Sequence, residues 1–166
     1  MQEYTTIYDR AEDSFIERKS EFIGHIAPVE TEEQALAFIA EIKKKHHDAT
    51  HNTHAYILRN GVKRYSDDGE PQGTAGVPML DCIEKEGLVD VAVVVTRYFG
   101  GILLGAGGLV RAYSHGAKIA VDAAKRKLMT TCTLLTWRWI IPSTARSTIS
   151  SRSIPAAWRT PTLARW

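Results

Sequence analysis

The segment VAVVVTRYFGGILLGAGGLVRAYSHGAKIAVDAA, residues 91–124, joins an apolar run to a glycine-rich loop and an amphipathic stretch. Residues 91–95 are all apolar and mostly β-branched, which is typical of a strand covered on both faces. The pair Gly100 and Gly101 then indicates a sharp change of backbone direction. From Leu109 the apolar residues recur with a helical period. We expect the chain to be organised around this strand, loop and helix.

The periodicity of the last part also predicts which helix face is buried. Apolar and polar side chains separate into two stripes along the predicted helix, as in a helix that packs on a sheet. The expected buried face is Leu109, Tyr113, Ala117, Ala120, Val121 and Ala124, and the expected polar face is Arg111, Ser114, His115, Lys118 and Asp122.

Length and composition favour one compact domain, with or without a small appendage. The chain has 166 residues, of which 44% are hydrophobic, enough to form a core. No apolar run approaches the roughly 20 residues of a membrane-spanning helix, and the start resembles no signal peptide. We therefore expect a cytoplasmic protein without a membrane partner. Cys82 and Cys132 form no CxxC pair, which argues against a disulfide framework or a cysteine-based zinc site.

Charge is divided unevenly along the chain. Residues 1–122 contain all 19 acidic residues and 13 of the 21 Lys and Arg, a net charge of −6. Residues 123–166 contain the remaining basic residues and no acid. Because phosphate contacts dominate nucleic-acid affinity, the acidic first part disfavours direct binding of nucleic acid by that part.

Shorter signals predict the other elements. Thr31 followed by Gln34 predicts a capping box that begins a helix, and Asn60-Gly61 predicts a two-residue hairpin turn. Thr74 is the expected N-cap of a second helix. The expected elements are strands at 4–8, 15–17 and 22–29, a helix at 31–45, strands at 54–58 and 62–66, a helix from about 74 to 86, a strand at 88–96 and a helix from 109.

Two polar stretches precede the central strand and raise the question of a metal site. Four histidines lie between residues 46 and 54, without a helical HxxxH pair or a neighbouring cysteine. Asp67, Asp68 and Glu70 lie in a tight Gly/Pro turn, whose spacing does not match an EF-hand loop. Turn formation and complementarity to the helix dipole explain these acids more simply than a cation or acid-base chemistry. We expect no metal.

The glycines do not match nucleotide-binding motifs. Gly105 and Gly107 satisfy half of GxGxxG, but Val110 occupies the place of the third glycine. A P-loop would need Lys and then Ser or Thr after the glycine, whereas Ala106 follows Gly105. Without GxSxG, Ser114 is not placed as a nucleophile. We expect no cofactor, and the catalytic residues, if any, remain unknown.

Seven titratable residues lie in or near the two glycine loops, at 66–76 and 97–111. They form the candidate cluster for chemistry. Arg97 has two open roles in it: it pairs with one of the acids and holds the loops together, or it contacts a ligand. The cluster is His54, Asp67, Asp68, Glu70, Arg97, Arg111 and His115.

Three segments resemble the signature blocks of the YigZ/IMPACT family. They are HNTHAYIL at 51–58, YSDDGEPQGTAGVPML at 65–80 and VVVTRYFGGILLGAGGLVRAYSHGA at 93–117, and the match runs from about Phe15 to Asp122. The resemblance implies an α+β domain similar to the second domain of a small-subunit ribosomal protein. This would be a two-layer sandwich, a mainly antiparallel sheet with two long helices on one face.

The resemblance also implies a function. Eukaryotic relatives act in translational control under amino-acid starvation by binding other proteins. We therefore expect a non-catalytic cytoplasmic binding or regulatory protein, whose partner is the translation machinery or a regulatory protein. The alternatives are an enzyme acting on an anionic small molecule at the two glycine-rich loops, and a nucleic-acid-binding module with RNA as its ligand.

The resemblance places any ligand or interaction in the loops at 66–76 and 97–111. The candidate residues are His54, Asp67, Asp68, Gly69, Glu70, Gly73, Thr74, Gly76, Arg97, Tyr98, Gly100, Gly101, Gly105, Gly107, Arg111 and His115.

After about Lys127 the chain no longer resembles the family, in whose bacterial members a ferredoxin-like second domain normally follows. Residues 130–166 contain 13 Ser and Thr and all four tryptophans, but no acid, no glycine and no sustained apolar period. We expect a domain at 1–127 and an atypical tail at 128–166 that is frameshifted or disordered. A genuine RNA-binding tail and a small unrecognised domain are the alternatives.

Overall fold

The computed structural model describes residues 3–130, so the predictions for the tail fall outside the described residues from 131 onward. The elements are, in chain order, β1 (Tyr4–Ile7), β2 (Ala11–Glu17), β3 (Ser20–Pro28), α1 (Glu32–Lys45), β4 (His51–Ile57), β5 (Lys63–Ser66), α2 (Gly76–Lys85), β6 (Val91–Tyr98), α3 (Ala106–Ala123) and β7 (Arg126–Met129).

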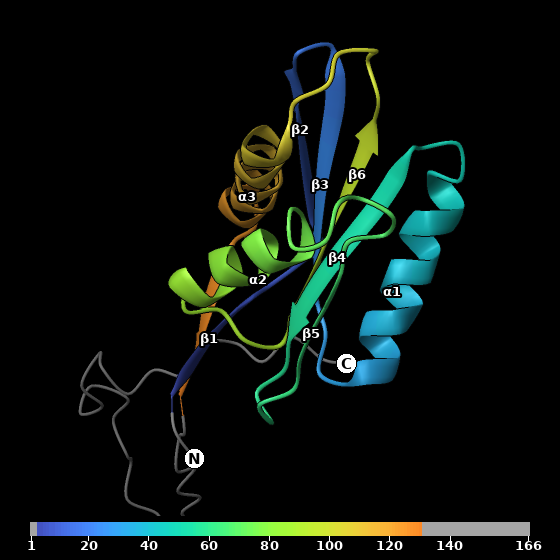
Figure 1. Ribbon diagram of the computed structural model, residues 1–166. Helices are drawn as coiled ribbons and strands as arrows, with labels where there is room; N and C mark the ends of the chain where they lie inside the picture. Colours follow the sequence, from blue (N-terminus) through green and yellow to red (C-terminus); the bar gives the residue numbers. More distant parts are fainter. Residues whose placement is uncertain (1–2, 131–166) are drawn as a thin grey trace, which may run out of the picture. The chain divides into compact units, whose positions relative to one another are not determined.

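Strand β6 is the middle strand of a five-stranded antiparallel sheet (Figure 1). The strand order is β2-β3-β6-β4-β5, and β6 pairs with β3 on one side and β4 on the other. All residues from Val91 to Arg97 are buried. A strand in this position is covered on both faces, which accounts for its uninterrupted apolar run.

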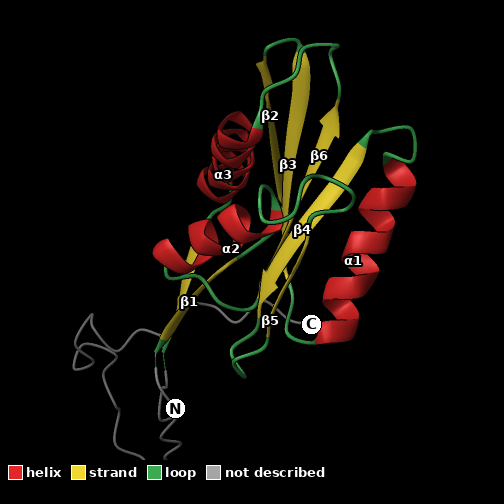
Figure 2. Cartoon of the chain, in the orientation of Figure 1, coloured by secondary structure: helices red, strands yellow, loops and turns green. Residues whose placement is uncertain are grey.

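Alternate residues of β6 contribute to two separate cores. Val91, Val93 and Val95 pack with α2 and α3, whereas Ala92 and Val94 pack with α1. Figure 2 shows α2 and α3 on one side of the sheet and α1 on the other. The predicted α+β class, the antiparallel sheet and a pair of helices on one face are confirmed. Helix α1 adds a third layer to the expected two, because β6 is apolar on both faces.

Two glycines allow α3 to lie close to the sheet. A Cβ on Gly24 of β3 would overlap the carbonyl oxygen of Gly116 in α3. A Cβ on Gly116 would lie 3.0 Å from Cγ1 of Val95. The close approach buries the predicted apolar face of α3, from Leu109 to Ala124.

The ends of the domain are joined by a smaller, two-stranded sheet. Strand β7 pairs antiparallel with β1, with Ile7 opposite Arg126. Strand β7 was not predicted, and its pairing extends the folded unit two residues past Lys127. At the start of α1, the predicted cap is present: Oγ1 of Thr31 accepts a hydrogen bond from Gln34 N at 3.3 Å.

His25 couples the stability of the domain to pH. Its side chain lies in β3 and is 3% exposed, with Nδ1 3.2 Å from Oε2 of Glu12, and Nε2 has no partner among the described residues. Burial, and then the nearby His46, lower the pKa of His25 from 6.5 to about 4. The ring is therefore neutral in the folded protein at neutral pH.

We predict that stability falls as the pH is lowered from 6.5 towards 4. In this window the unfolded chain binds a proton at His25 that the folded chain does not, so the free energy of unfolding decreases, by about 3 kcal/mol over the window. Urea unfolding of the wild type, His25→Gln and His47→Gln near pH 7.5 and near pH 4.5 measures the effect. His25→Gln should lose less stability on acidification than the wild type, and His47→Gln, at an exposed position, should match the wild type. An equal loss in all three proteins would contradict the prediction.

Candidate functional site

The carboxylate of Asp67 organises the first glycine loop. It accepts hydrogen bonds from the backbone N–H groups of Gly73 at 2.9 Å, Ala75 at 3.1 Å and Gly76 at 2.8 Å. Two of these amides belong to the start of α2. The first turn of α2 therefore already has an anionic partner within the protein.

The predicted N-cap of α2 is wrong. Ala75, not Thr74, occupies the cap position, and it makes no side-chain cap bond. The hydroxyl of Thr74 instead donates to the carbonyl oxygen of Pro71 at 2.6 Å. The physical reason is that Asp67 reaches the helix amides from eight and nine residues away along the chain, beyond the local spacing of a capping box.

Glu70, Arg97 and Tyr113 form a buried polar network. Oε1 of Glu70 accepts hydrogen bonds from Nη1 of Arg97 at 2.6 Å and from the hydroxyl of Tyr113 at 2.7 Å. The side chains of Arg97 and Glu70 are 6% and 4% exposed. The guanidinium carbon of Arg97 lies 5.5 Å from the ring centre of Phe22 and 5.4 Å from that of Phe99. Of the two roles left open for Arg97, the structure shows pairing with an acid.

Burial and the hydrogen bond to Glu70 raise the pKa of Tyr113 far above its usual value. Tyr113 is therefore a permanent hydrogen-bond donor at physiological pH. The network joins three parts of the chain: the end of β6, the first glycine loop and α3. His51 lies at its edge, with Nε2 3.8 Å from Oε1 of Glu70.

We predict that Glu70→Gln destabilises the protein by about 3 kcal/mol, because Arg97 would remain buried without a counter-charge. Urea unfolding at neutral pH measures this loss. Glu17→Gln, which removes a carboxylate at an exposed position, should change stability by less than about 0.5 kcal/mol. Equal effects of the two substitutions would show that the ion pair is not required for folding.

Asp68 and His54 lie towards α1 rather than beside α3. Asp68 accepts hydrogen bonds from Nζ of Lys43 at 2.6 Å and from Asn52 N at 2.7 Å. Burial alone would raise the pKa of Asp68, but these two hydrogen bonds hold it below its usual value. Burial, and then the charge of Lys43, lower the pKa of His54.

The second glycine loop packs against the β2–β3 turn, and both lie at the upper end of the domain in Figure 1. A Cβ on Gly100 would overlap the carbonyl oxygen of Lys19, and Gly100 N donates to Oγ of Ser20 at 3.2 Å. Nη1 of Arg18 donates to the carbonyl oxygen of Leu103 at 3.5 Å. Gly100 is therefore required for the contact between the loop and the turn.

Substitution by alanine is expected to have opposite effects on stability at Gly100 and at Gly107. Gly100→Ala should destabilise the protein by about 2 kcal/mol because the backbone of Lys19 must move. Gly107 has open space around its Cβ position and no positive φ, so Gly107→Ala should stabilise α3 by about 0.5 kcal/mol. Thermal and urea unfolding of both variants test the pair. Destabilisation by both substitutions would contradict the described packing around Gly107.

Two cavities flank the second glycine loop. The turn pocket, ≈ 490 Å³, lies between the β2–β3 turn and α3. The loop pocket, ≈ 440 Å³, lies between the two glycine loops. The turn pocket is lined among others by Phe15, Glu17, Arg18, Arg111 and His115, and the loop pocket by His51, Glu70, Arg97, Phe99, Leu103 and Ala106.

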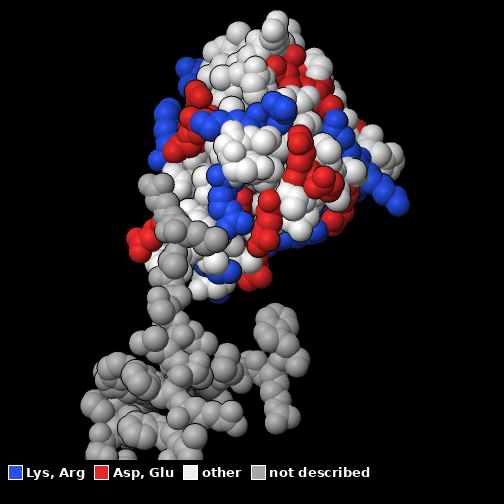
Figure 3. All heavy atoms as spheres, turned by 90° about the horizontal axis from the view of Figure 1, so that it is seen from below, with Lys and Arg blue, Asp and Glu red and all other residues white. Residues whose placement is uncertain are grey.

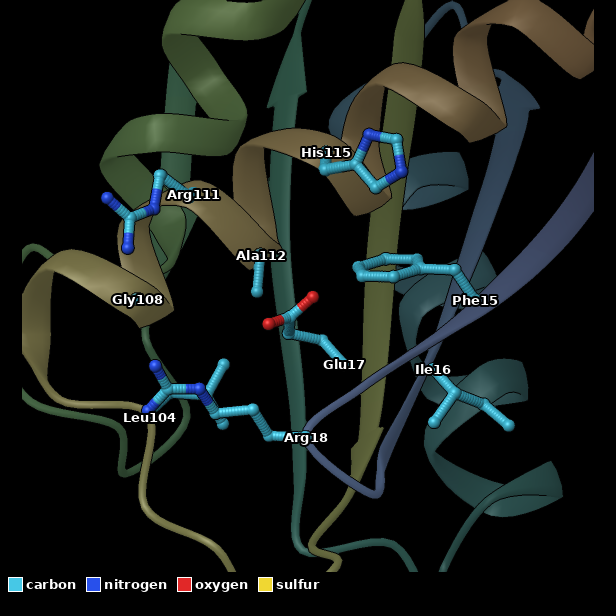
Figure 4. A pocket seen from close by; sticks show the side chains of 9 residues that line it. All are labelled: Phe15, Ile16, Glu17, Arg18, Leu104, Gly108, Arg111, Ala112 and His115. Carbon is cyan, nitrogen blue, oxygen red and sulfur yellow. The ribbon is translucent and has the colours of Figure 1, made fainter.

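Figure 4 shows the turn pocket, with Phe15 and Glu17 pointing from β2 towards α3. The ring of Phe15 meets that of His115 edge to face, with centroids 4.6 Å apart. Arg18 and Arg111 are both exposed, so they supply solvated positive charge at the rim of this pocket.

The structure divides the predicted cluster of seven titratable residues. Glu70 and Arg97 line the loop pocket, whereas Arg111 and His115 line the turn pocket. The remaining three have the other contacts described above. The seven residues therefore do not converge on one site, because Asp68 and His54 lie towards α1 and the others are divided between the start of α2 and two separate pockets.

The other candidates have mainly structural contacts. The hydroxyl of Tyr98 bonds to Nδ1 of His46 at 2.9 Å and to Oδ1 of Asp48 at 3.1 Å. Positive φ angles, which favour glycine, occur at Gly69, Gly73, Gly101 and Gly105. Their roles in ligand binding stay predictions.

Sequence reasoning missed a group of exposed apolar side chains. Ile16 is 73% exposed, Phe99 45%, Ile102 40% and Leu103 80%. The available signal was the apolar run between the glycine pairs, ILL at 102–104, which has no helical or strand period. We name the three residues of the second loop, Phe99, Ile102 and Leu103, the apolar end surface.

Two absences hold for the described residues 3–130. They contain no group of three or more His, Cys, Asp or Glu arranged to hold a metal ion. Within the same range, no helix is long and apolar enough to cross a membrane.

The model of the Impact N-terminal domain matches residues 18–121. The chain is 46% identical over 134 residues to the IMPACT family member YvyE of Bacillus subtilis, covering 78% of this chain and 62% of that protein. It is 43% identical over 117 residues to the IMPACT family member YigZ of Escherichia coli, covering 68% of this chain and 55% of that protein. A crystal structure of a hypothetical protein matches with a TM-score of 0.75 and 36% identity, over 78% of this chain and 65% of that one.

The chain thus spans less than two thirds of the length of these two curated relatives. The match of the family model extends over more than half of the 166 residues and contains both glycine loops and the central strand. The resemblance of the three sequence segments is confirmed, and the chain belongs to the IMPACT family through its Impact N-terminal domain.

Proposed function

We propose that this chain is a cytoplasmic, non-catalytic binding or regulatory protein linked to translation, and that it docks a protein of the translation machinery through the apolar end surface. Membership of the IMPACT family supports the link to translation, since eukaryotic relatives act in translational control. The choice of docking site rests on the exposure of the apolar side chains of this surface.

The apolar end surface combines high exposure with a rigid base. Leu103 and Phe99 are exposed by 80% and 45%. The backbone beneath them is held by the contact of Gly100 with Lys19 and by the bond from Arg18 to Leu103. Large exposed apolar side chains that gather at one end of a domain are typical of protein interfaces. A preformed surface also lowers the entropy cost of association.

The enzyme alternative receives less support from the same residues. A general acid or base needs access to its substrate, but Glu70 is 4% exposed and bound to Arg97 and Tyr113. Asp67 is bound to three backbone amides, and Asp68 to Lys43. These carboxylates hold the loops in place.

The nucleic-acid alternative also receives less support. Figure 3 shows Lys and Arg interspersed with Asp and Glu on the face seen from below. Ion pairs occur between Lys63 and Glu84 at 2.9 Å and between Arg126 and Glu86 at 2.6 Å. Binding to phosphates requires a surface with excess positive charge, and pairing of this kind reduces it.

Glutamate substitutions at two exposed leucines test the proposal. Leu103→Glu should weaken co-sedimentation of the full chain with ribosomal particles, or its binding to an identified translation factor, by about tenfold or more, because it places a charge in the apolar contact. Leu36→Glu, on α1 and 52% exposed, should bind as the wild type does. Both variants should unfold at the temperature of the wild type.

Two outcomes would overturn the proposal. The first is a wild-type chain that associates with neither ribosomal particles nor translation factors. The second is equal binding by Leu103→Glu and Leu36→Glu.

A further inference from the structure

We propose that the loop pocket binds a terminal carboxylate group attached to an apolar body, with the carboxylate at the first turn of α3. The inference goes beyond the proposed docking of a translation partner. Phe99 and Leu103 of the apolar end surface also line this cavity, but the ligand is a small chemical group, and its binding is measured without ribosomal particles or translation factors.

The first turn of α3 lacks an internal anionic partner. Gly105 is its N-cap, with φ 73°, and no side chain makes a cap hydrogen bond. Helix α3 has 18 residues, so its dipole at this end is well developed. The contrast with α2 is direct, since Asp67 occupies the corresponding amides there. Unpaired N–H groups at a helix start are a common binding site for anions.

Gly107 leaves the backbone of this turn open. No atom lies within 4 Å of the position of its Cβ, and its φ is not in the left-handed region. Packing and conformation therefore do not require glycine here, although glycine weakens a helix relative to alanine. An external group can approach the backbone at Gly107 closely, because the position of its Cβ is empty.

Arg97 provides a second, independent indication of a ligand. Its side chain is 6% exposed and lines the loop pocket together with Gly105 and Ala106. Nη1 is bound to Glu70, but the buried Nε has no partner among the described residues. An unsatisfied buried donor is costly unless a ligand or water completes it.

The charge balance of the pocket favours a monoanion. The charges of Arg97 and Glu70 offset one another across a 2.6 Å ion pair, so the remaining positive potential is that of the α3 terminus, about half an elementary charge. A carboxylate matches this potential. A phosphate dianion is disfavoured, because Glu70 would repel its second charge.

The other walls of the pocket select an apolar body. Pro71 lies on the first loop, and Phe99, Leu103 and Leu109 lie on the side of the second loop and α3. The volume of ≈ 440 Å³ falls in the range of small-molecule sites. A carboxylate with an apolar side chain occurs in free apolar acids and at the C-terminus of a polypeptide that ends in an apolar residue.

Calorimetric titration of the full chain tests the chemistry and separates these two sources. N-acetyl-leucine should bind at millimolar concentration, and N-acetyl-leucinamide, which lacks the carboxylate, about tenfold more weakly or not at all. A pentapeptide with a free C-terminal leucine distinguishes the sources. Tighter binding of the peptide than of N-acetyl-leucine indicates a polypeptide C-terminus, and equal or weaker binding indicates a free acid.

Gly107→Asp supplies an internal carboxylate to the same amides. We expect it to abolish binding of N-acetyl-leucine while the melting temperature stays equal to or rises above that of the wild type, because an acid at this helix position complements the dipole. Gly107→Asn is the matched control of similar size and should retain binding. Loss of binding together with an unchanged or higher melting temperature excludes misfolding as the cause of the lost binding.

Four results would overturn the inference: no binding of N-acetyl-leucine, equal binding of its amide, tighter binding of inorganic phosphate, or unchanged binding by Gly107→Asp. A failure of ribosome association would not contradict the inference, since the titrations of the wild type and of the Gly107 variants do not use that assay.

Discussion

The buried ion pair between Arg97 and Glu70 is the constraint on which the two glycine loops depend. Burying two charges is costly, and a short ion pair with further hydrogen bonds offsets part of that cost. Tyr113 supplies the further donor to Glu70, and two aromatic rings enclose the guanidinium. Loss of either charge would leave the other buried and unpaired. The pair therefore sets the separation of the loops and, with it, the cavity between them.

Close packing at three glycines also fixes the positions of α3 and of the second loop. Gly24 and Gly116 allow α3 to lie on the sheet, and Gly100 allows the second loop to lie on the β2–β3 turn. The carboxylates of the first loop are bound to partners within the protein, whereas apolar groups such as Leu103 remain exposed. The proposed binding role rests on this distribution of bound carboxylates and exposed apolar side chains.

Local patterns predicted much of the fold. The buried face of α3, the cap at Thr31 and the central strand all follow from periods and spacings within about four residues. The cap of α2 could not be predicted in this way, because Asp67 acts on it through a loop of several residues. Strand β7 was not predicted, because it has only four residues. Their alternation between exposed and half-buried positions is too short to indicate a strand without the partner strand, β1.

The sequence by itself determined the α+β class, the family and the position of the two glycine loops, since each depends on local periodicity or on a specific order of residue types. Only the tertiary structure decided that Arg97 pairs with Glu70 rather than with Asp67 or Asp68, and that Arg111 and His115 line a different cavity. The physical reason is that pairing of charges and enclosure of space depend on distances between chain segments far apart in sequence. The central strand and its glycine loop thus specify the fold locally, and their contacts with Lys19, Glu70 and Tyr113 are set by the tertiary structure.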